Sequence, residues 1–546
     1  MVRVLRRVKL SVFALSVGVL FFAASLTPSM IPRSAALQGV LGGVTFALGY
    51  LLAVAIAALW CYLELPKPSD RFRTAAEGAI AIVGIGMLIP ALMRNVGYQN
   101  ELRALMGMPS LEQDSSATII AAAFGTFGAL LLLGRLVKVM AAKIQRRLAR
   151  RIPPRAAMVA SLTLVAVISW NIGNGVILRS ALDAADSGLR EVDAFIDPEL
   201  PPPDGRFRAG GAGSLVSWPS LGARGRAFVA GGWTEEEISR FHGGAPATTP
   251  VRIYAGLNSA DNVSSRAHKV LEEMLRVGAF GRRILVIVSP TGTGWVDPEA
   301  VDPLEVMHRG DTAIVAMQYS YLSSPLSLLF EPDLAPESAQ ALAGAIYNYW
   351  VTLPSETRPR LYLHGLSLGS YASEQALSPL RLISDPIDGA LWSGPTFNNA
   401  IWKSMTRNRN PGSPYWSPRI DDSSVVRFTT QKNTLDSAPA QWARTRAIYL
   451  QYPSDPITFF EVQTAYRRPE WMMSPRAPDV SEKFTWFPIV TMLQLAMDMA
   501  TATDVSKGFG HLFSAAHYID AWESLTDPEA WSESDASRLR SAFQKH

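Results

Sequence analysis

Cysteine is almost absent from this sequence. The chain of 546 residues has a single cysteine, Cys61, which lies inside an apolar segment. One cysteine cannot form a disulfide within the chain, and it excludes a zinc site built from several cysteines. A C-terminal part without cysteine is compatible with an oxidising compartment but does not require one.

Charged residues are also scarce, and they are unevenly distributed. They make up 18% of the chain, and the mean hydropathy is +0.12, which is typical of a membrane protein. Residues 1–179 hold 19 Lys/Arg and 6 Asp/Glu, whereas residues 180–546 hold 32 and 41. Because the basic residues flank apolar stretches, membrane topology explains them better than nucleic-acid binding. We therefore expect no nucleic-acid partner.

Five apolar stretches in residues 1–179 are long enough to cross a bilayer. They are 9–29, 36–63, 75–93, 117–137 and 156–178. The sequence thus predicts a transmembrane domain of about five helices over residues 1–179.

Lys and Arg gather before the first stretch, in the second connection and between residues 135 and 155. Since basic residues favour the cytoplasmic side, this pattern places the N-terminus inside and the C-terminal domain outside the cell inner (plasma) membrane. The first stretch could instead be a signal peptide. In that case four spans remain, and the C-terminal domain is still extracytoplasmic.

Residues 180–250 connect the two halves. An amphipathic helix is predicted over 180–195, where it could lie on the membrane surface or pack against the next domain. The Pro/Gly-rich stretch 198–213 is the predicted boundary. A strand at 226–230 and a short helix at 234–241 are expected after it.

Residues 251–546 alternate between short apolar runs and amphipathic stretches. Strands are predicted at 251–256, 283–289, 311–318, 360–364, 389–392 and 447–451, and helices at 264–277 and 338–352. This alternation predicts a mostly parallel sheet with helices on both faces, the fold of an α/β-hydrolase. The segments 394–443 and 457–504 lie where such folds insert caps.

A nucleophile elbow is predicted at residues 365–369, where Gly-Leu-Ser-Leu-Gly follows the strand at 360–364. The glycines permit a sharp turn from strand to helix that leaves the Ser367 hydroxyl exposed. The next N–H, that of Leu368, then points toward the position of an oxyanion.

A second oxyanion donor is expected in the Gly-rich loop 289–296, from Thr293 or Gly294. Such a loop is equally typical of an ordinary tight turn.

An acid and a histidine follow the elbow in the order expected for a triad. Asp455 comes just after the strand at 447–451 and is the predicted acid. His511, in Gly-Phe-Gly-His, is preferred as the base over His517, which lies in a helical pattern. Neither a metal nor an organic cofactor is required by this chemistry.

Several stretches together resemble alpha/beta-hydrolase family 9, bacterial proteins in which a multi-pass membrane domain precedes a serine-hydrolase-like domain. They are GSLVSWPSLG at 213–222, PTGTGWVDP at 290–298, GDTAIVAMQYSYL at 310–322, GLSLGS at 365–370, YLQYPSDPI at 449–457 and GH with YIDAW in 510–522. The resemblance implies a triad of Ser367, Asp455 and His511. An acidic residue often stands in this family where Leu366 stands here, a departure that bears on substrate preference.

These observations predict a membrane-anchored serine hydrolase, similar to an esterase or lipase. Its substrate would be an ester or thioester, such as a lipid or a cell-envelope acyl group, on the extracytoplasmic side. Two alternatives stay open: an acyltransferase with the same triad, and a non-catalytic envelope scaffold that retains a hydrolase fold.

Overall fold

The computed structural model describes residues 10–66, 69–112, 115–171, 188–473 and 475–544. The chain divides into two compact units, which we describe separately. The helical unit comprises Met1–Leu182 and Phe460–Ser506, and the sheet unit comprises Asp183–Phe459 and Lys507–His546.

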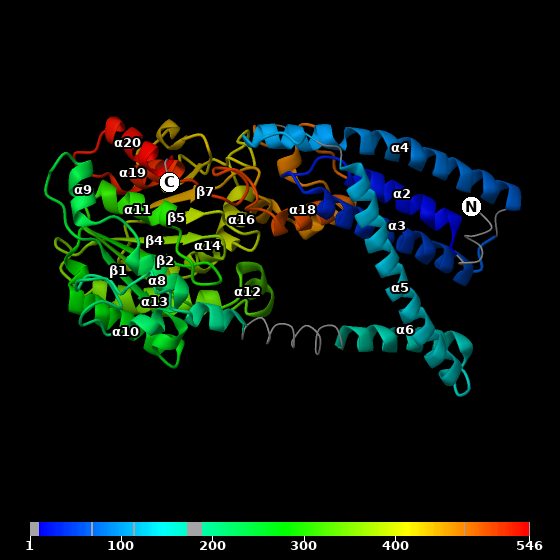
Figure 1. Ribbon diagram of the computed structural model, residues 1–546, viewed down its shortest axis with the longest axis horizontal. Helices are drawn as coiled ribbons and strands as arrows, with labels where there is room; N and C mark the ends of the chain where they lie inside the picture. The colour runs from blue at the N-terminus through cyan, green and yellow to red at the C-terminus, as the bar shows by residue number, and fades with distance from the viewer. Residues whose placement is uncertain (1–9, 67–68, 113–114, 172–187, 474, 545–546) are drawn as a thin grey trace. The chain divides into compact units, whose positions relative to one another are not determined.

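The sheet unit is built on a parallel sheet that has seven strands within the described residues (Figure 1). The strands are β1 (Val251–Ala255), β2 (Ile284–Ser289), β3 (Thr312–Met317), β4 (Arg360–Leu366), β5 (Gly389–Ser393), β6 (Val426–Thr429) and β7 (Arg446–Leu450). Their order in the sheet is β1-β3-β2-β4-β5-β7-β6. β4 therefore lies in the middle, between β2 and β5.

Helices cover both faces of this sheet, as Figure 1 shows. On one face α10 (Val263–Val277) packs against α13 (Leu334–Trp350), and on the other α11 (Pro298–Met307) packs against α19 (Ala515–Thr526). The strands are buried along almost their whole length, as expected when helices cover a sheet on both sides. The predicted α/β-hydrolase fold is confirmed.

The remaining helices of the sheet unit are short or terminal. They are α8 (Gly222–Ala230), α9 (Glu235–Phe241), α12 (Ser324–Phe330), α14 (Leu368–Ser373), α15 (Pro379–Ser384), α16 (Ala400–Arg407), α17 (Pro456–Phe459) and α20 (Glu533–Gln544).

Three local expectations differ from the structure. The strand predicted at 226–230 is the end of α8, because Phe228 and Val229 are buried at helical rather than alternating spacing. The predicted boundary at 198–213 is part of the sheet unit, since the Ala209 N–H donates to the Arg252 carbonyl at the edge of β1. Strand β6 was missed because its four residues lie within a long irregular insertion.

The predicted amphipathic helix at 180–195 is described only from residue 188, and residues 188–194 are helical. Its Asp193 accepts a hydrogen bond from the Ala223 N–H of α8 at 3.0 Å. Val192 and Phe195 are both 66% exposed. The segment therefore packs on the sheet unit and keeps apolar side chains at the surface.

The helical unit contains a helix at each of the five predicted apolar stretches. They are α2 (Val12–Ser25), α3 (Ala35–Tyr62), α4 (Asp70–Leu105), α5 (Ser116–Leu148) and α6 (Pro154–Trp170). The last part of the fifth stretch lies outside the described residues. Of the described helices, α3, α4 and α5 are long and apolar enough to cross a membrane.

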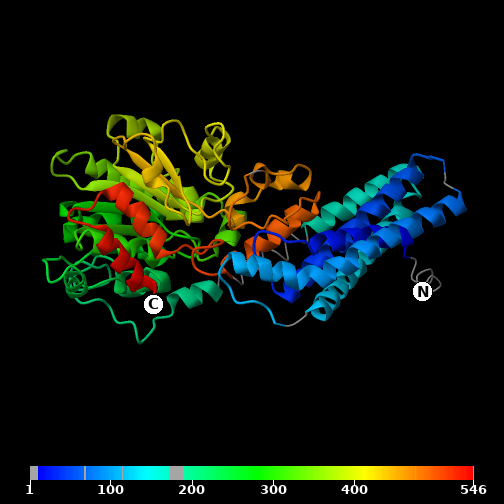
Figure 2. The ribbon, with the colours of Figure 1, turned by 90° about the horizontal axis from the view of Figure 1, so that it is seen from above.

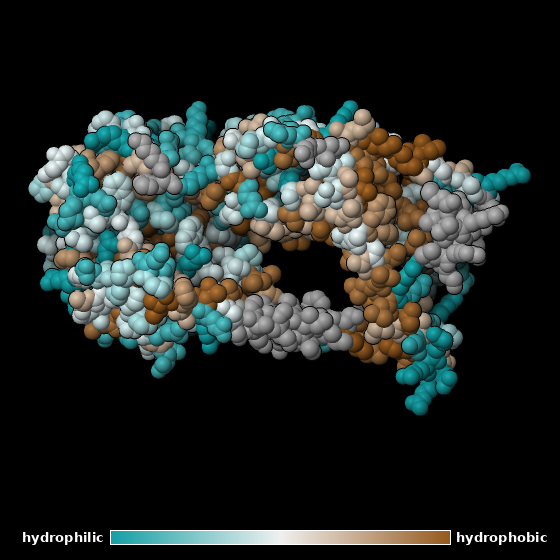
Figure 3. Space-filling model, viewed as in Figure 1, coloured by the Kyte–Doolittle hydropathy of each residue, from teal (hydrophilic) through white to brown (hydrophobic). Residues whose placement is uncertain are grey.

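Large apolar side chains are exposed along these three helices, and Figure 3 shows apolar surface gathered over them. Phe72 and Ile82 of α4, and Phe124 and Leu132 of α5, are each at least 67% exposed. A water-facing surface of this kind is rare, whereas a lipid-facing surface requires it.

The segment 457–504 was expected to cap the C-terminal domain, but residues 460–506 belong to the helical unit. Its helix α18 (Val490–Ala500) lies beside α2 and α3 (Figure 2). Arg33 and Asp498 form an ion pair at 2.6 Å, with both side chains at most 1% exposed. Asp498 also accepts the Met30 N–H at 3.1 Å. This buried pairing decides where the segment docks.

Glycines allow α3 to approach both of its neighbours closely. A Cβ on Gly39 would lie 2.5 Å from the Ala122 Cβ of α5, and one on Gly43 would lie 2.5 Å from the Thr126 Cβ. Gly42 faces the Phe22 ring of α2 in the same way. Small residues at such positions are how apolar helices associate within a bilayer, where burial of apolar surface gives little driving force.

We predict that Gly43→Ala destabilises the helical unit by about 1–3 kcal/mol, since the added methyl group overpacks the contact between α3 and α5. Gly86→Ala is the matched control, because no atom lies within 4 Å of a Cβ at that position in α4. The measurement is thermal unfolding of the full chain in detergent. An equal effect of both substitutions would contradict the prediction.

Candidate active site

Ser367 stands at the turn between β4 and α14 with a φ of 58°. This left-handed conformation is strained for a serine and is held by its two flanking glycines. A Cβ on Gly365 would overlap the Gly369 carbonyl, and one on Gly369 would overlap the Ser289 carbonyl of β2. The predicted elbow therefore exists as a close backbone contact between β4, α14 and the end of β2.

Asp455 lies in the connection between β7 and α17 and is fully buried. Its Oδ1 accepts the Ile457 N–H at 2.8 Å, and its Oδ2 accepts the Thr458 hydroxyl at 3.0 Å. These donors fix the orientation of the carboxylate and stabilise its charge. One further bond to Oδ2 comes from a distant histidine.

His511 provides that bond: its Nδ1 lies 2.6 Å from Asp455 Oδ2, across 56 residues of sequence. The Gly510 N–H donates to the Ser454 hydroxyl at 3.1 Å, which fixes the loop that carries the imidazole. A proton on Nδ1 leaves Nε2 with a free lone pair. Nε2 is buried and has no hydrogen-bond partner among the described residues.

The imidazole and the elbow meet at the end of β5. The Ser367 N–H donates to the Ser393 carbonyl at 3.0 Å. The next residue, Gly394, has a φ of 49°, and a Cβ on it would lie 2.7 Å from His511 Cε1. The structure thus brings the three predicted residues to the carboxyl ends of β4, β5 and β7. The Ser367 hydroxyl and His511 Nε2 are not hydrogen-bonded to each other here.

Among residues 291–294 of the loop after β2, three of the four backbone N–H groups are engaged. The Thr291 N–H donates to Trp295, the Gly292 N–H to Ser324, and the Gly294 N–H to Thr291. Because its N–H is already engaged, Gly294 is an unsuitable oxyanion donor. The Thr293 N–H makes no hydrogen bond within the described part of the chain. Thr293 therefore remains the candidate from this loop, beside Leu368 at the start of α14.

Two other histidines of the sheet unit, His517 and His364, have different partners. His517 Nδ1 lies 2.5 Å from the Tyr452 hydroxyl, and burial lowers the pKa of His517 to about 4. His364, at the centre of β4, contacts the Leu391 carbonyl through Nδ1 at 2.8 Å. Burial lowers the pKa of His364 to about 4 as well. Both are neutral packing residues at pH 7, which leaves His511 as the histidine beside the acid.

Sequence reasoning missed Gly394, Ser454 and Thr458, which hold the acid and the imidazole in place. The signal for Gly394 was present, because Ser-Gly-Pro directly follows a predicted strand. No comparable signal marked Ser454 or Thr458, since a hydroxyl beside an Asp-Pro turn is common in loops.

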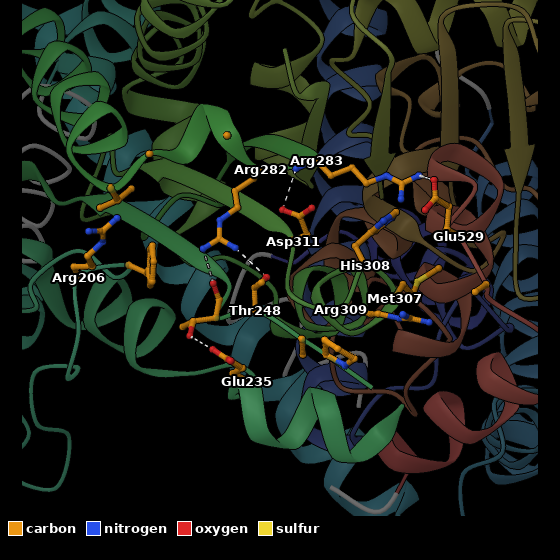
Figure 4. A pocket seen from close by; sticks show the side chains of 18 residues that line it. Arg206, Glu235, Thr248, Arg282, Arg283, Met307, His308, Arg309, Asp311 and Glu529 are labelled. Atoms are coloured by element: carbon orange, nitrogen blue, oxygen red, sulfur yellow. Dashed lines mark hydrogen bonds and ion pairs between the residues drawn. The ribbon is translucent and has the colours of Figure 1, made fainter. Parts of the chain in front are cut away.

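A pocket of about 790 Å³ lies at the opposite edge of the sheet (Figure 4). Arg282 and Arg283 directly precede β2, and Asp311 directly precedes β3, so the pocket opens at the amino ends of the strands. Arg283 is paired with Glu529 at 2.6 Å. This pocket is separate from Ser367 and His511. Among the described residues, no group of three His, Cys, Asp or Glu side chains could hold a metal ion.

Comparison with known families agrees with this fold. Residues 251–539 match the alpha/beta-hydrolase family, and residues 26–232 match the N-terminal region of the same family. The chain therefore belongs to this alpha/beta-hydrolase family. No curated protein matches the chain. No solved structure matches it either.

One buried carboxyl close to the loop after β2 predicts a dependence of stability on pH. Asp297 caps α11, accepting the Glu299 N–H at 3.0 Å, and burial raises the pKa of Asp297 from 3.8 to about 7. The folded state therefore keeps a proton that the unfolded chain loses. The resulting stabilisation is complete below pH 3.8 and is lost as the pH rises through about 7.

We predict that Asp297→Asn removes this pH-dependent loss of folding stability, which amounts to no more than roughly 4 kcal/mol. Asparagine retains the oxygen that caps α11 but cannot ionise. The check is the thermal midpoint of both proteins measured from pH 4 to pH 8. The difference between variant and wild type should grow in favour of the variant as the pH rises. Parallel profiles would show that Asp297 does not titrate in this range.

Proposed function

We propose that this protein is a membrane-anchored serine hydrolase that cleaves esters or thioesters. The observation that carries the proposal is the Asp455–His511 bond of 2.6 Å beside the elbow. It leaves a buried Nε2 free to take a proton. A buried carboxylate, an oriented imidazole and a strained serine are the parts that nucleophilic acyl transfer needs.

In the first step Ser367 Oγ attacks the acyl carbon while His511 Nε2 accepts its proton. Closing the gap between these two groups requires substrate, as is common when catalytic hydrogen bonds tighten only in the complex. The N–H groups of Leu368 and Thr293 hold the oxyanion. The leaving alcohol or thiol takes the proton from Nε2, and an acyl-Ser367 ester remains.

In the second step a water molecule loses a proton to His511 and attacks this ester. The carboxylic acid departs, and Ser367 regains its proton from Nε2. Asp455 keeps the imidazole in the required tautomer and stabilises the imidazolium in both steps. An acyltransferase would follow the same course with an alcohol in place of water, and analysis of the product distinguishes the two.

A lipid or cell-envelope acyl group is the substrate that suits this arrangement. The helices α3, α4 and α5 would hold the chain at a membrane, and the side chains of the site are buried. Ser367 is 6% and His511 8% exposed, so a bound acyl group would exclude water from the reacting atoms.

The decisive experiment is labelling of the purified full chain by a fluorophosphonate probe. We expect Ser367→Ala to abolish labelling and to lower ester hydrolysis about 10⁴-fold or more, since the nucleophile is lost. Ser378→Ala is the control, because this exposed serine precedes α15 without a side-chain capping bond.

Unchanged labelling of Ser367→Ala would refute the proposal. A folded wild-type protein that neither reacts with the probe nor turns over esters would favour the alternative of a non-catalytic envelope scaffold.

The proposed orientation predicts the accessibility of engineered cysteines, which the single native cysteine makes easy to test. In a Cys61→Ala background, Ser378→Cys should react with a membrane-impermeant maleimide in intact cells. Arg150→Cys, in the basic stretch between α5 and α6, should react only after the membrane is permeabilised. The reverse pattern would place the sheet unit in the cytoplasm.

A further inference from the structure

A cavity of about 670 Å³, with charged and amide side chains among its lining residues, lies within the helical unit and has no part in the proposed reaction. Its volume is in the range of small-ligand sites. It is formed where α3 and α5 begin, where α4 ends and just beyond α18. The lining residues that carry the argument are Arg33, Gln38, Gln99, Arg103, Glu112 and Asp504.

Arg33 is the central group on the cationic side of this cavity. Its side chain is 1% exposed and is held by Asp498 through Nε at 2.6 Å. Its Nη1 donates to Gln38 Oε1 at 2.9 Å, and its backbone N–H donates to Gln99 Oε1 at 2.8 Å. Nη2 is buried and has no partner within the described residues. An unpaired buried donor of this kind is costly and is well suited to an anionic acceptor.

Two helix N-termini line the same cavity. Ser34 caps α3, a helix of 28 residues, and Ser115 precedes α5, a helix of 33 residues. The N-terminal end of each helix carries a partial positive charge and free N–H groups, which favour phosphate. Arg103 adds a full charge, and its Nε donates to the Pro109 carbonyl at 2.5 Å. One side of the cavity is therefore arranged for an anion.

The rim also carries two acids, Glu112 and Asp504, both exposed. They would repel a simple anion, but they would bind a cation placed next to one. No aromatic residue is present among the described lining residues, so a cation–π cage for a quaternary ammonium is not formed by them. A primary ammonium, which can donate hydrogen bonds to carboxylates, fits these acids better.

The cavity also lies at the depth where lipid headgroups would be found. α3, α4 and α5 are the described helices able to cross a membrane, and the start or end of each reaches the cavity. A bilayer crossed by these helices presents its headgroups at their ends. A phosphate linked to a primary ammonium is thus available as part of a phospholipid.

We propose that this cavity binds the phosphoethanolamine headgroup of a phospholipid, with the phosphate at Arg33, Arg103 and the two helix N-termini and the ammonium at Glu112 and Asp504. The site is independent of Ser367. It supplies the helical unit with a specific lipid contact.

The test is native mass spectrometry of the full chain with equimolar phosphatidylethanolamine, phosphatidylglycerol and phosphatidylcholine of identical acyl chains. The wild type should retain phosphatidylethanolamine best. In the double variant Glu112→Gln/Asp504→Asn, the preference for phosphatidylethanolamine over phosphatidylglycerol should be about tenfold weaker than in the wild type. This is the effect expected for loss of charge-assisted hydrogen bonds. Substitution of Arg33 is avoided, because it would leave Asp498 buried without its cation.

Arg103→Gln should weaken retention of all three lipids, whereas Arg94→Gln should not, because Arg94 is exposed on α4 and does not line the cavity. Ser367→Ala should bind lipid as the wild type does, so that failure of this proposal and failure of the enzymatic one are distinguishable. Equal retention of the three lipids by wild type and variants would overturn the proposal. A preference for phosphatidylglycerol would overturn it too.

Soluble glycerophosphoethanolamine identifies the source of the ligand. If it raises the thermal midpoint of the detergent-purified wild type but not that of the double variant, the headgroup alone is recognised. If only the intact phospholipid binds, the ligand is a membrane lipid, as proposed, and the headgroup alone is not sufficient for binding.

Discussion

The contact between Gly369 and the Ser289 carbonyl is the constraint on which the candidate site depends. No side chain fits between these backbones, so α14 starts directly against the end of β2, whose Ser289 is paired with Gly365. This closeness forces Ser367 into a left-handed conformation. It also places the start of α14 against Pro290, the residue that follows β2. The strained turn at Ser367 and the position of the Leu368 N–H at the start of α14 therefore share one structural cause.

The pairing of the acid with the imidazole depends on a different feature, which is the position of the two points where the chain leaves and re-enters the sheet unit. The chain leaves the sheet unit at Phe459, just after Asp455, and returns at Lys507, just before His511. The bond between the two side chains joins the two ends of the inserted segment 460–506. Inside the helical unit, this segment is held by the buried ion pair of Arg33 and Asp498. A long insertion can thus be accommodated without separating the acid from the imidazole.

The candidate active site and the proposed lipid-binding cavity both have polar groups where several regular elements begin or end. In the sheet unit these are the carboxyl ends of β4, β5 and β7, where parallel strands leave loops free to carry side chains. In the helical unit they are the starts of α3 and α5 and the end of α4, where backbone groups lack partners within the helix.

Local patterns in the sequence were sufficient to predict the parallel sheet, the apolar helices and the elbow, because each depends on residues close together in the chain. The order of Asp455 and His511 also pointed to a pair, which the structure forms, while their catalytic role stays a prediction. Only tertiary structure decided that 460–506 joins the helical unit, since the Arg33–Asp498 pair spans 465 residues. It alone showed that the Gly294 N–H is engaged and that Gly394 must be glycine. Such contacts arise between distant segments, and no local pattern encodes them.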